Sequence, residues 1–121
     1  ERNKKKYLEH GNLHSFRSIM SIEDIIKAYW LTAKKGKVGE IYNIGQTEEI
    51  SIKNLAQLII DTSNSNSKIK FLSHKDVFGD KFEDPTRRTP NIDKIVKATG
   101  IKPGYDIQTM IKEIVEFKRQ D

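Results

Sequence analysis

The sequence predicts a mixed α/β lobe of about four helices with short strands between them. Two observations support this fold class. Four segments place apolar residues at helical spacing. Between them lie short apolar or alternating segments that are bounded by glycine or by polar residues. The 121 residues are enough for one modest core, so residues 1–121 are expected to form a single domain.

The first predicted helix runs from Ser21 to Lys35. Ser21 is the expected N-cap, and two acidic residues in the first turn favour a helix start. Gly36 and Gly39 follow the last turn, as glycines commonly do where helices end. The apolar stripe expected to face the core consists of Ile22, Ile25, Ile26, Tyr29 and Ala33.

Three more helices are predicted downstream. The second begins at its cap, Ser51, and extends to about Asp61. The third follows Pro90, with Asn91 as the expected cap and Gly100 as the stop. The fourth is capped by Asp106 and continues to about residue 119.

Strands are expected between the helices. Glu40–Ile44 is an apolar segment between glycines, and Lys68–Leu72 alternates with period two, which is typical of a half-exposed strand. Residues 6–9 and 16–20 are weaker candidates. Residues 76–89 are predicted to form a long loop, and such loops are often functional. In the predicted strand Glu40–Ile44, we expect Tyr42 to pack in the core and Asn43 to pair with backbone, rather than either residue contacting a ligand.

Composition excludes several classes of protein. The chain has no cysteine, which excludes disulfides and thiolate metal sites and is compatible with the cytoplasm, the expected location. The three histidines are isolated, so no metal site is expected. No apolar run approaches the ~20 residues of a membrane span, and no secretory signal opens the chain. The net charge of +5 comes from lysines interleaved with acids, so nucleic acid is not an expected partner.

The arginines are the residues that point to a ligand. There are five of them against seventeen lysines. Arg17 precedes the first helix, and Arg87 and Arg88 lie in the predicted long loop. Because the planar guanidinium can bind phosphate at two points, arginines kept in loops are candidates for binding an anion. Charge and placement alone leave a second interpretation equally open, which is ion pairing with Glu23, Glu83 or Asp84.

A series of short sequence motifs favours anion binding over ion pairing for these arginines. The chain resembles the extended short-chain dehydrogenase/reductases, in the branch that acts on nucleotide sugars. The matches run from residue 11 to about residue 117. They are G-N-x-x-x-x-R-D-F-x-Y-V-x-D-V-V at Gly11–Ile26, G-E-V-Y-N-I-G at Gly39–Gly45, x-I-S-I-x-E-L-A at Glu49–Ala56, F-E-D-x-x-R-R-x-P-D-I-S-K at Phe82–Lys94 and L-G-W-x-P within Ala98–Pro103.

This resemblance implies the fold and role of the C-terminal, substrate-binding region of an NAD-dependent nucleotide-sugar epimerase or dehydratase. The parent reaction would be that of a 4-epimerase, a 4,6-dehydratase or a decarboxylase. The resemblance further implies that Arg17 contacts the diphosphate of a nucleoside-diphosphate sugar and that Arg88 contacts the diphosphate or the nucleoside. Arg87 and Asp84 would flank Arg88, and the acid would orient the guanidinium or accept a bond from a ribose hydroxyl. Ser18, Ser21, Asn91 and Ile101 depart from the motifs and affect the subfamily more than the fold.

The family's catalytic Tyr-x-x-x-Lys pair and its glycine-rich dinucleotide loop precede this region and do not occur in the chain. We therefore expect a fragment that lacks the N-terminal Rossmann domain, which would hold NAD in a parent enzyme that is a homodimer. The chain alone is not expected to catalyse a reaction. The alternative is a free-standing binding or interaction module derived from this lobe and without activity.

Overall fold

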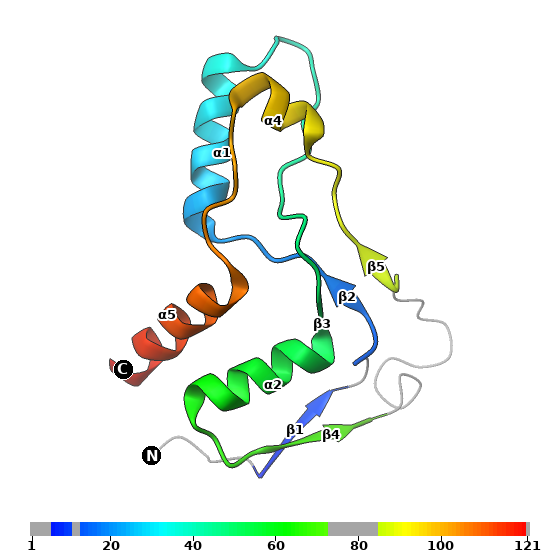
Figure 1. Ribbon diagram of the computed structural model, residues 1–121, viewed down its shortest axis with the longest axis vertical. Coiled ribbons are helices and arrows are strands. Elements are labelled where there is room, and N and C mark those ends of the chain that lie inside the picture. Colours follow the sequence, from blue (N-terminus) through cyan, green and yellow to red (C-terminus); the bar gives the residue numbers. More distant parts are fainter. Residues whose placement is uncertain (1–5, 11–12, 73–84, 121) are drawn as a thin grey trace.

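The computed structural model describes residues 6–10, 13–72 and 85–120, and it forms the mixed α/β lobe that the sequence predicts (Figure 1). The four predicted helices are present. In chain order the elements are β1 (Tyr7–His10), β2 (Phe16–Arg17), α1 (Ile22–Lys35), β3 (Ile50–Ser51), α2 (Ile52–Ser63), β4 (Lys68–Phe71), β5 (Arg87–Arg88), α4 (Asp93–Thr99) and α5 (Ile107–Gln120).

The strands form two small sheets. β1 pairs with β4 in parallel, and a second sheet has the order β3-β2-β5. In that second sheet β2 is antiparallel to β3 and parallel to β5. Figure 1 shows this sheet between one end of the molecule, formed by α1 and α4, and the other end, where α2 lies beside β1 and β4. The sheet thus joins the two helical ends.

The N-terminus of α1 is capped as predicted, because the Oγ of Ser21 accepts the N–H of Asp24 at 3.1 Å. The predicted apolar stripe, however, is mostly wrong. Ile22, Ile26 and Tyr29 are 60%, 61% and 64% exposed. The inward face instead contains Asp24 and Ala28, at 4% and 1% exposure.

A buried polar contact explains this rotation of α1. One carboxylate oxygen of Asp24 accepts the N–H groups of Gly104 and Tyr105 at 2.8 and 3.1 Å. These bonds fix α1 to the turn before α5, and they satisfy a charge that would otherwise be costly to bury. One turn further along the same face, Ala28 enters the main core, which it forms with Ile92, Ile95 and Ile101.

At the other end of the molecule, α2 and α5 agree closely with the helices predicted from the sequence. The Oγ of Ser51 caps α2 by accepting the N–H of Asn54 at 3.1 Å, and the carboxylate of Asp106 caps α5 by accepting the N–H of Thr109 at 2.7 Å. α2 ends at Ser63, two residues beyond the predicted end, and packs against α5. Buried residues on the two helices include Ala56, Met110 and Ile111. None of the described helices has the length and apolar character needed to cross a membrane.

Three predictions of local structure are wrong. Residues 40–44 form no strand, because no described strand pairs with them. Their contacts come from side chains: Tyr42 packs against the main core, and Asn43 donates to the carbonyl of Asn91 at 3.2 Å. Asn91 is not the cap of α4, which begins one residue later than that would require. Two residues of the predicted long loop, Arg87 and Arg88, form β5; its residues 76–84 lie outside the described part of the chain.

Candidate functional site

The carboxyl ends of β2 and β5 bring two of the predicted site residues together. These strands are parallel, and Arg17 pairs in register with Arg88. Since register partners project from the same face of a sheet, both arginines belong to one face. Phe16 and Arg87 form the preceding pair and belong to the opposite face. Open α/β sheets commonly bind ligands just beyond the carboxyl ends of parallel strands.

A hollow of about 480 Å³ lies at this edge of the sheet, and Arg88 is one of the residues that line it. Arg88 is exposed, and its guanidinium has no polar partner among the described residues. Its donors are thus available to a ligand. The remaining lining residues come from the segments after β2 and β5 and from α1 and residues 43–46; they are Ser18, Met20, Ile25, Asn43, Ile44, Gly45, Gln46, Thr89 and Pro90.

Arg17 has a different environment from Arg88. It is half-buried, and its Nη1 donates to the carbonyl oxygens of Phe16 at 2.7 Å and Pro85 at 3.0 Å. The second bond joins β2 to the residues just before β5. Arg17 is not one of the residues that line the hollow. The structure therefore places Arg17 beside Arg88 in the sheet but engages part of its guanidinium with backbone.

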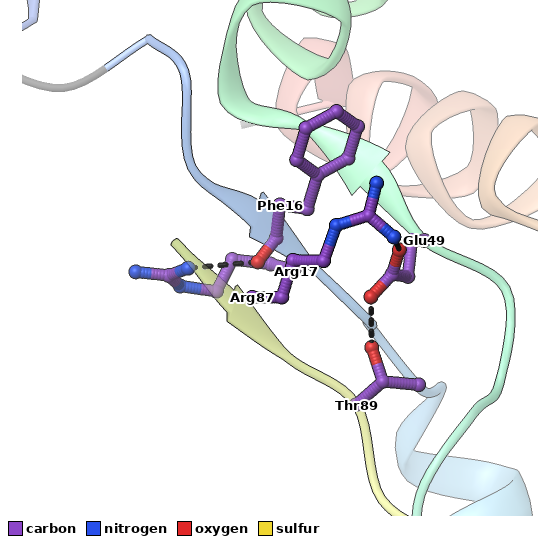
Figure 2. Close-up of polar contacts among 5 residues, drawn as sticks. All are labelled: Phe16, Arg17, Glu49, Arg87 and Thr89. Carbon is purple, nitrogen blue, oxygen red and sulfur yellow. Dashed lines mark hydrogen bonds and ion pairs between the residues drawn. The ribbon is translucent and has the colours of Figure 1, made fainter. Parts of the chain in front are cut away.

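Arg87 contacts a residue that the sequence did not identify. Its Nη1 donates to Glu49 at 3.0 Å, and its guanidinium lies over the ring of Phe16, 4.7 Å from the centroid. Glu49 also accepts a hydrogen bond from the hydroxyl of Thr89 (Figure 2). Glu49 is 38 residues from Arg87, and only the strand order β3-β2-β5 brings it close. Asp84, the remaining predicted site residue, lies outside the described residues.

A second hollow of about 470 Å³ contains lysines but no arginine. It is lined by Lys35, Lys37, Glu40, Tyr42, Lys94, Lys97 and Ala98. Lys94 pairs with Glu40 at 2.6 Å, and this hydrogen bond together with the lysine charge lowers the pKa of Glu40. Lys35 and Lys97 lie in the last turns of α1 and α4, where cations interact favourably with the helix dipole. Three of the four lysines in this hollow are thus explained by the fold, and the Arg88 hollow is the better candidate site.

The described residues do not fit a dinucleotide or a metal ion. In dinucleotide-binding folds the pyrophosphate of the cofactor is held by the open N–H groups of a glycine-rich turn at a helix start. α1 and α2 instead begin at serine caps, whose hydroxyls already accept one of those N–H groups. In the described part of the chain, no three His, Cys, Asp or Glu side chains are grouped so as to hold a metal ion.

Comparison with known proteins gives a consistent family. The family model for GDP-mannose 4,6 dehydratase matches residues 1–114. The human dTDP-D-glucose 4,6-dehydratase is 30% identical over 115 residues, which are 93% of this chain and 32% of that protein. The UDP-N-acetyl-alpha-D-glucosaminuronate decarboxylase of Bacillus cytotoxicus is 27% identical over 113 residues, 93% of this chain and 35% of its own length.

Solved structures share the fold of this lobe. The dTDP-glucose 4,6-dehydratase of Bacillus anthracis, in complex with NAD, superposes with a TM-score of 0.81 at 22% identity, over 96% of this chain and 35% of that one. The UDP-glucose 4-epimerase of Thermotoga maritima, with UDP-glucose, gives 0.80 at 18% identity, over 94% and 34%. This chain spans about a third of the length of these relatives. It belongs to the GDP-mannose 4,6-dehydratase family of extended short-chain dehydrogenase/reductases, as its motifs predict.

Proposed function

We propose that this chain is the part of an NAD-dependent nucleotide-sugar epimerase or dehydratase that binds the nucleoside-diphosphate sugar. The observation that supports it most directly is Arg88, an exposed arginine without a polar partner among the described residues, which lines a hollow of about 480 Å³. Two of the relatives described above act on dTDP- and UDP-linked sugars by their names. A diphosphate is the shared group that such an arginine would recognise.

Arg88 supplies a planar, two-point donor for the diphosphate, which a lysine cannot match. Arg17, its register partner, adds a second positive charge at the same sheet edge. Arg87 adjoins Arg88 in β5 and is neutralised by Glu49. Asp84 is added to this site by the family resemblance alone and lies outside the described residues. Contacts to the nucleotide fix the sugar in place and let remote binding energy position the reacting group. No proton or hydride transfer is assigned to residues of this chain, because its tyrosines have no lysine four residues on.

The rest of the parent enzyme is inferred from the relatives. They are about three times longer than this chain, and the Bacillus anthracis structure holds NAD. We infer a Rossmann domain that binds NAD and precedes residues 1–121. The family resemblance, not the relatives' names, is the basis for proposing a homodimeric parent and a cytoplasmic location. The absence of cysteine is compatible with that location. The gene sequence upstream of this chain tests the inference: a glycine-rich strand–helix turn and a Tyr-x-x-x-Lys pair are expected within roughly 200 residues.

Calorimetric titration tests the binding proposal. UDP, GDP and dTDP are titrated into the chain and into its Arg88→Lys variant, which keeps the charge but removes the two-point fork. At least one nucleotide is expected to bind the wild-type chain, with roughly tenfold weaker binding to the variant. Arg119→Lys, the same change on α5, is the matched control and should retain wild-type affinity. Equal affinities for wild type and Arg88→Lys would remove Arg88 from the site.

A further inference from the structure

The two residues that flank Arg88 make contacts that bear on the orientation of its side chain. Arg87 and Arg88 form β5, and Thr89 follows directly. Side chains alternate between the two faces along an extended chain, so the side chain of Arg87 belongs to one face and that of Arg88 to the other. Thr89 borders the hollow together with Arg88, but its hydroxyl bonds to Glu49, the residue that also holds Arg87. Contacts made by these two neighbours therefore bear on how Arg88 is presented.

Glu49 makes a side-chain contact with each of these two residues, Arg87 and Thr89. One carboxylate oxygen accepts from Arg87 Nη1 at 3.0 Å, and the other accepts from the hydroxyl of Thr89 (Figure 2). The side chain of Glu49 is 21% exposed, against 66% for that of Arg87. A partly shielded carboxylate with two separate donors has a more defined position than an isolated surface ion pair.

The contact also spans the sheet. Glu49 immediately precedes β3, at one edge, while Arg87 and Thr89 belong to the β5 edge. Between them lies β2, where Phe16 packs beneath the guanidinium of Arg87. The registers place Phe16 opposite both Ser51 and Arg87, so continuing two residues along each neighbouring segment brings Glu49 and Thr89 to that same side.

β5 depends on such a contact because its own pairing is small. It has two residues, both exposed, and pairs only with β2 among the described strands. A two-residue edge strand has too few ladder bonds to fix its rotation firmly. Glu49 adds one side-chain bond to each of the two neighbours of Arg88, and its carboxylate neutralises Arg87.

We propose that Glu49 is a positioning residue, which holds Arg87 and Thr89, the two neighbours of Arg88, so that Arg88 is presented to the hollow. This inference rests on the proposed function of Arg88. It assigns Glu49 no contact with the ligand.

The test compares Glu49→Gln with Glu48→Gln, the same change one residue away at an exposed position. Binding of UDP, GDP and dTDP is measured by calorimetry, with circular dichroism to check the fold. Glu49→Gln is expected to weaken nucleotide binding roughly three- to tenfold, and Glu48→Gln less than twofold. A folded Glu49→Gln variant with wild-type affinity would overturn the proposal.

A double-mutant cycle separates positioning from a general effect on the fold. If Glu49 acts through Arg88, then Glu49→Gln should produce no further loss in an Arg88→Ala background. Losses that simply add would overturn the proposal, since Glu49 would then act independently of Arg88. If Glu49→Gln fails to fold, Thr89→Val serves instead, because it removes one of the two bonds to Glu49. Thr89→Val is expected to cause a smaller loss of nucleotide affinity, and no loss in the Arg88→Ala background. A loss of affinity that persists in that background would reject the proposal.

The same variants distinguish failure of this inference from failure of the proposed function. If the wild-type chain binds none of the three nucleotides, the proposed function fails. The positioning role of Glu49 is then tested only by the backbone order of the residues around Arg88. The heteronuclear ¹⁵N NOE of the Arg87, Arg88 and Thr89 amides is then measured with and without the Glu49→Gln change. Lower values at these residues in the variant are expected, and unchanged values would overturn the positioning role.

Discussion

At the scale of single residues, Gly45 and Pro90 determine the shape of the Arg88 hollow, which both of them line. A Cβ on Gly45 would lie 2.5 Å from Cγ of Pro90, far inside van der Waals contact. The proline ring cannot rotate away from such an atom, because it is closed onto its own backbone. Glycine is therefore required at position 45 for steric reasons, and its neighbour is rigid. Pro90 follows Thr89 directly, so a displaced ring would also disturb the residues next to Arg88.

We expect Gly45→Ala to lower the free energy of unfolding by about 1–3 kcal/mol, the usual cost of overpacking, and to weaken nucleotide binding. Urea unfolding and calorimetric titration measure the two effects. Gly104→Ala is the matched control, because a Cβ there would lie at an ordinary 3.6 Å from the Asp24 carboxylate. If the two variants were equally stable, the Pro90 ring would have to move away from the added Cβ more easily than its closed geometry implies.

At the scale of elements, local features were predictable and non-local ones were not. The caps Ser21, Ser51 and Asp106 were identified because each bonds an N–H only three residues away. The inward face of α1 was predicted wrongly because Asp24 is buried by partners 80 and 81 residues further along the chain. The strand predicted at 40–44 required a pairing partner, which periodicity does not reveal.

The candidate site shows the same division. Nothing in the spacing of Arg17 and Arg88 predicts that β2 and β5 pair in parallel, so their proximity could be anticipated only through the family resemblance. Glu49 is not predicted from the sequence because it immediately precedes β3, which lies at the opposite edge of that sheet from β5. A sequence signal for it would have required knowledge of the strand order. The ion-pair partners that the sequence suggests for the loop arginines are Glu23, Glu83 and Asp84, because these acids are close to Arg17 or to Arg87 and Arg88 along the chain.

The cap of α5 gives a pH-dependent prediction. The pKa of Asp106 is lowered, chiefly by the backbone N–H of Thr109. A carboxyl whose folded pKa is depressed contributes stability above its unfolded pKa and loses it as the pH falls through the folded value. Asp106→Asn keeps an acceptor but not the charge. We expect the variant to be less stable than wild type at pH 7 and equal to it once the pH is well below about 4. Urea unfolding across this range measures the difference, and a gap that stays constant with pH would contradict this cause.

At the scale of the whole molecule, the outer face of α1, formed by Ile22, Ile26, Tyr29 and Trp30, remains uncovered in the described chain. These four residues are 60%, 61%, 64% and 61% exposed. The chain has a modest apolar content of 36% and spans about a third of its relatives' length. An apolar helix face of this kind is typical of a surface that packs against another part of a protein. With a net charge of +5, copies of the chain repel one another, which opposes self-association through this face.

Trp30 reports on this face directly, since it is the only tryptophan in the sequence. Trp30 is 61% exposed, and the ammonium of Lys34 lies 4.6 Å from its ring centroid. We expect strong quenching of its fluorescence by iodide and weaker quenching by caesium, because the lysine attracts the anion and repels the cation. Lys34→Gln should reduce the difference between the two ions, whereas Lys53→Gln, on α2, should not. Protection of Trp30 from both ions at low protein concentration would mean that the outer face of α1 is covered in this chain.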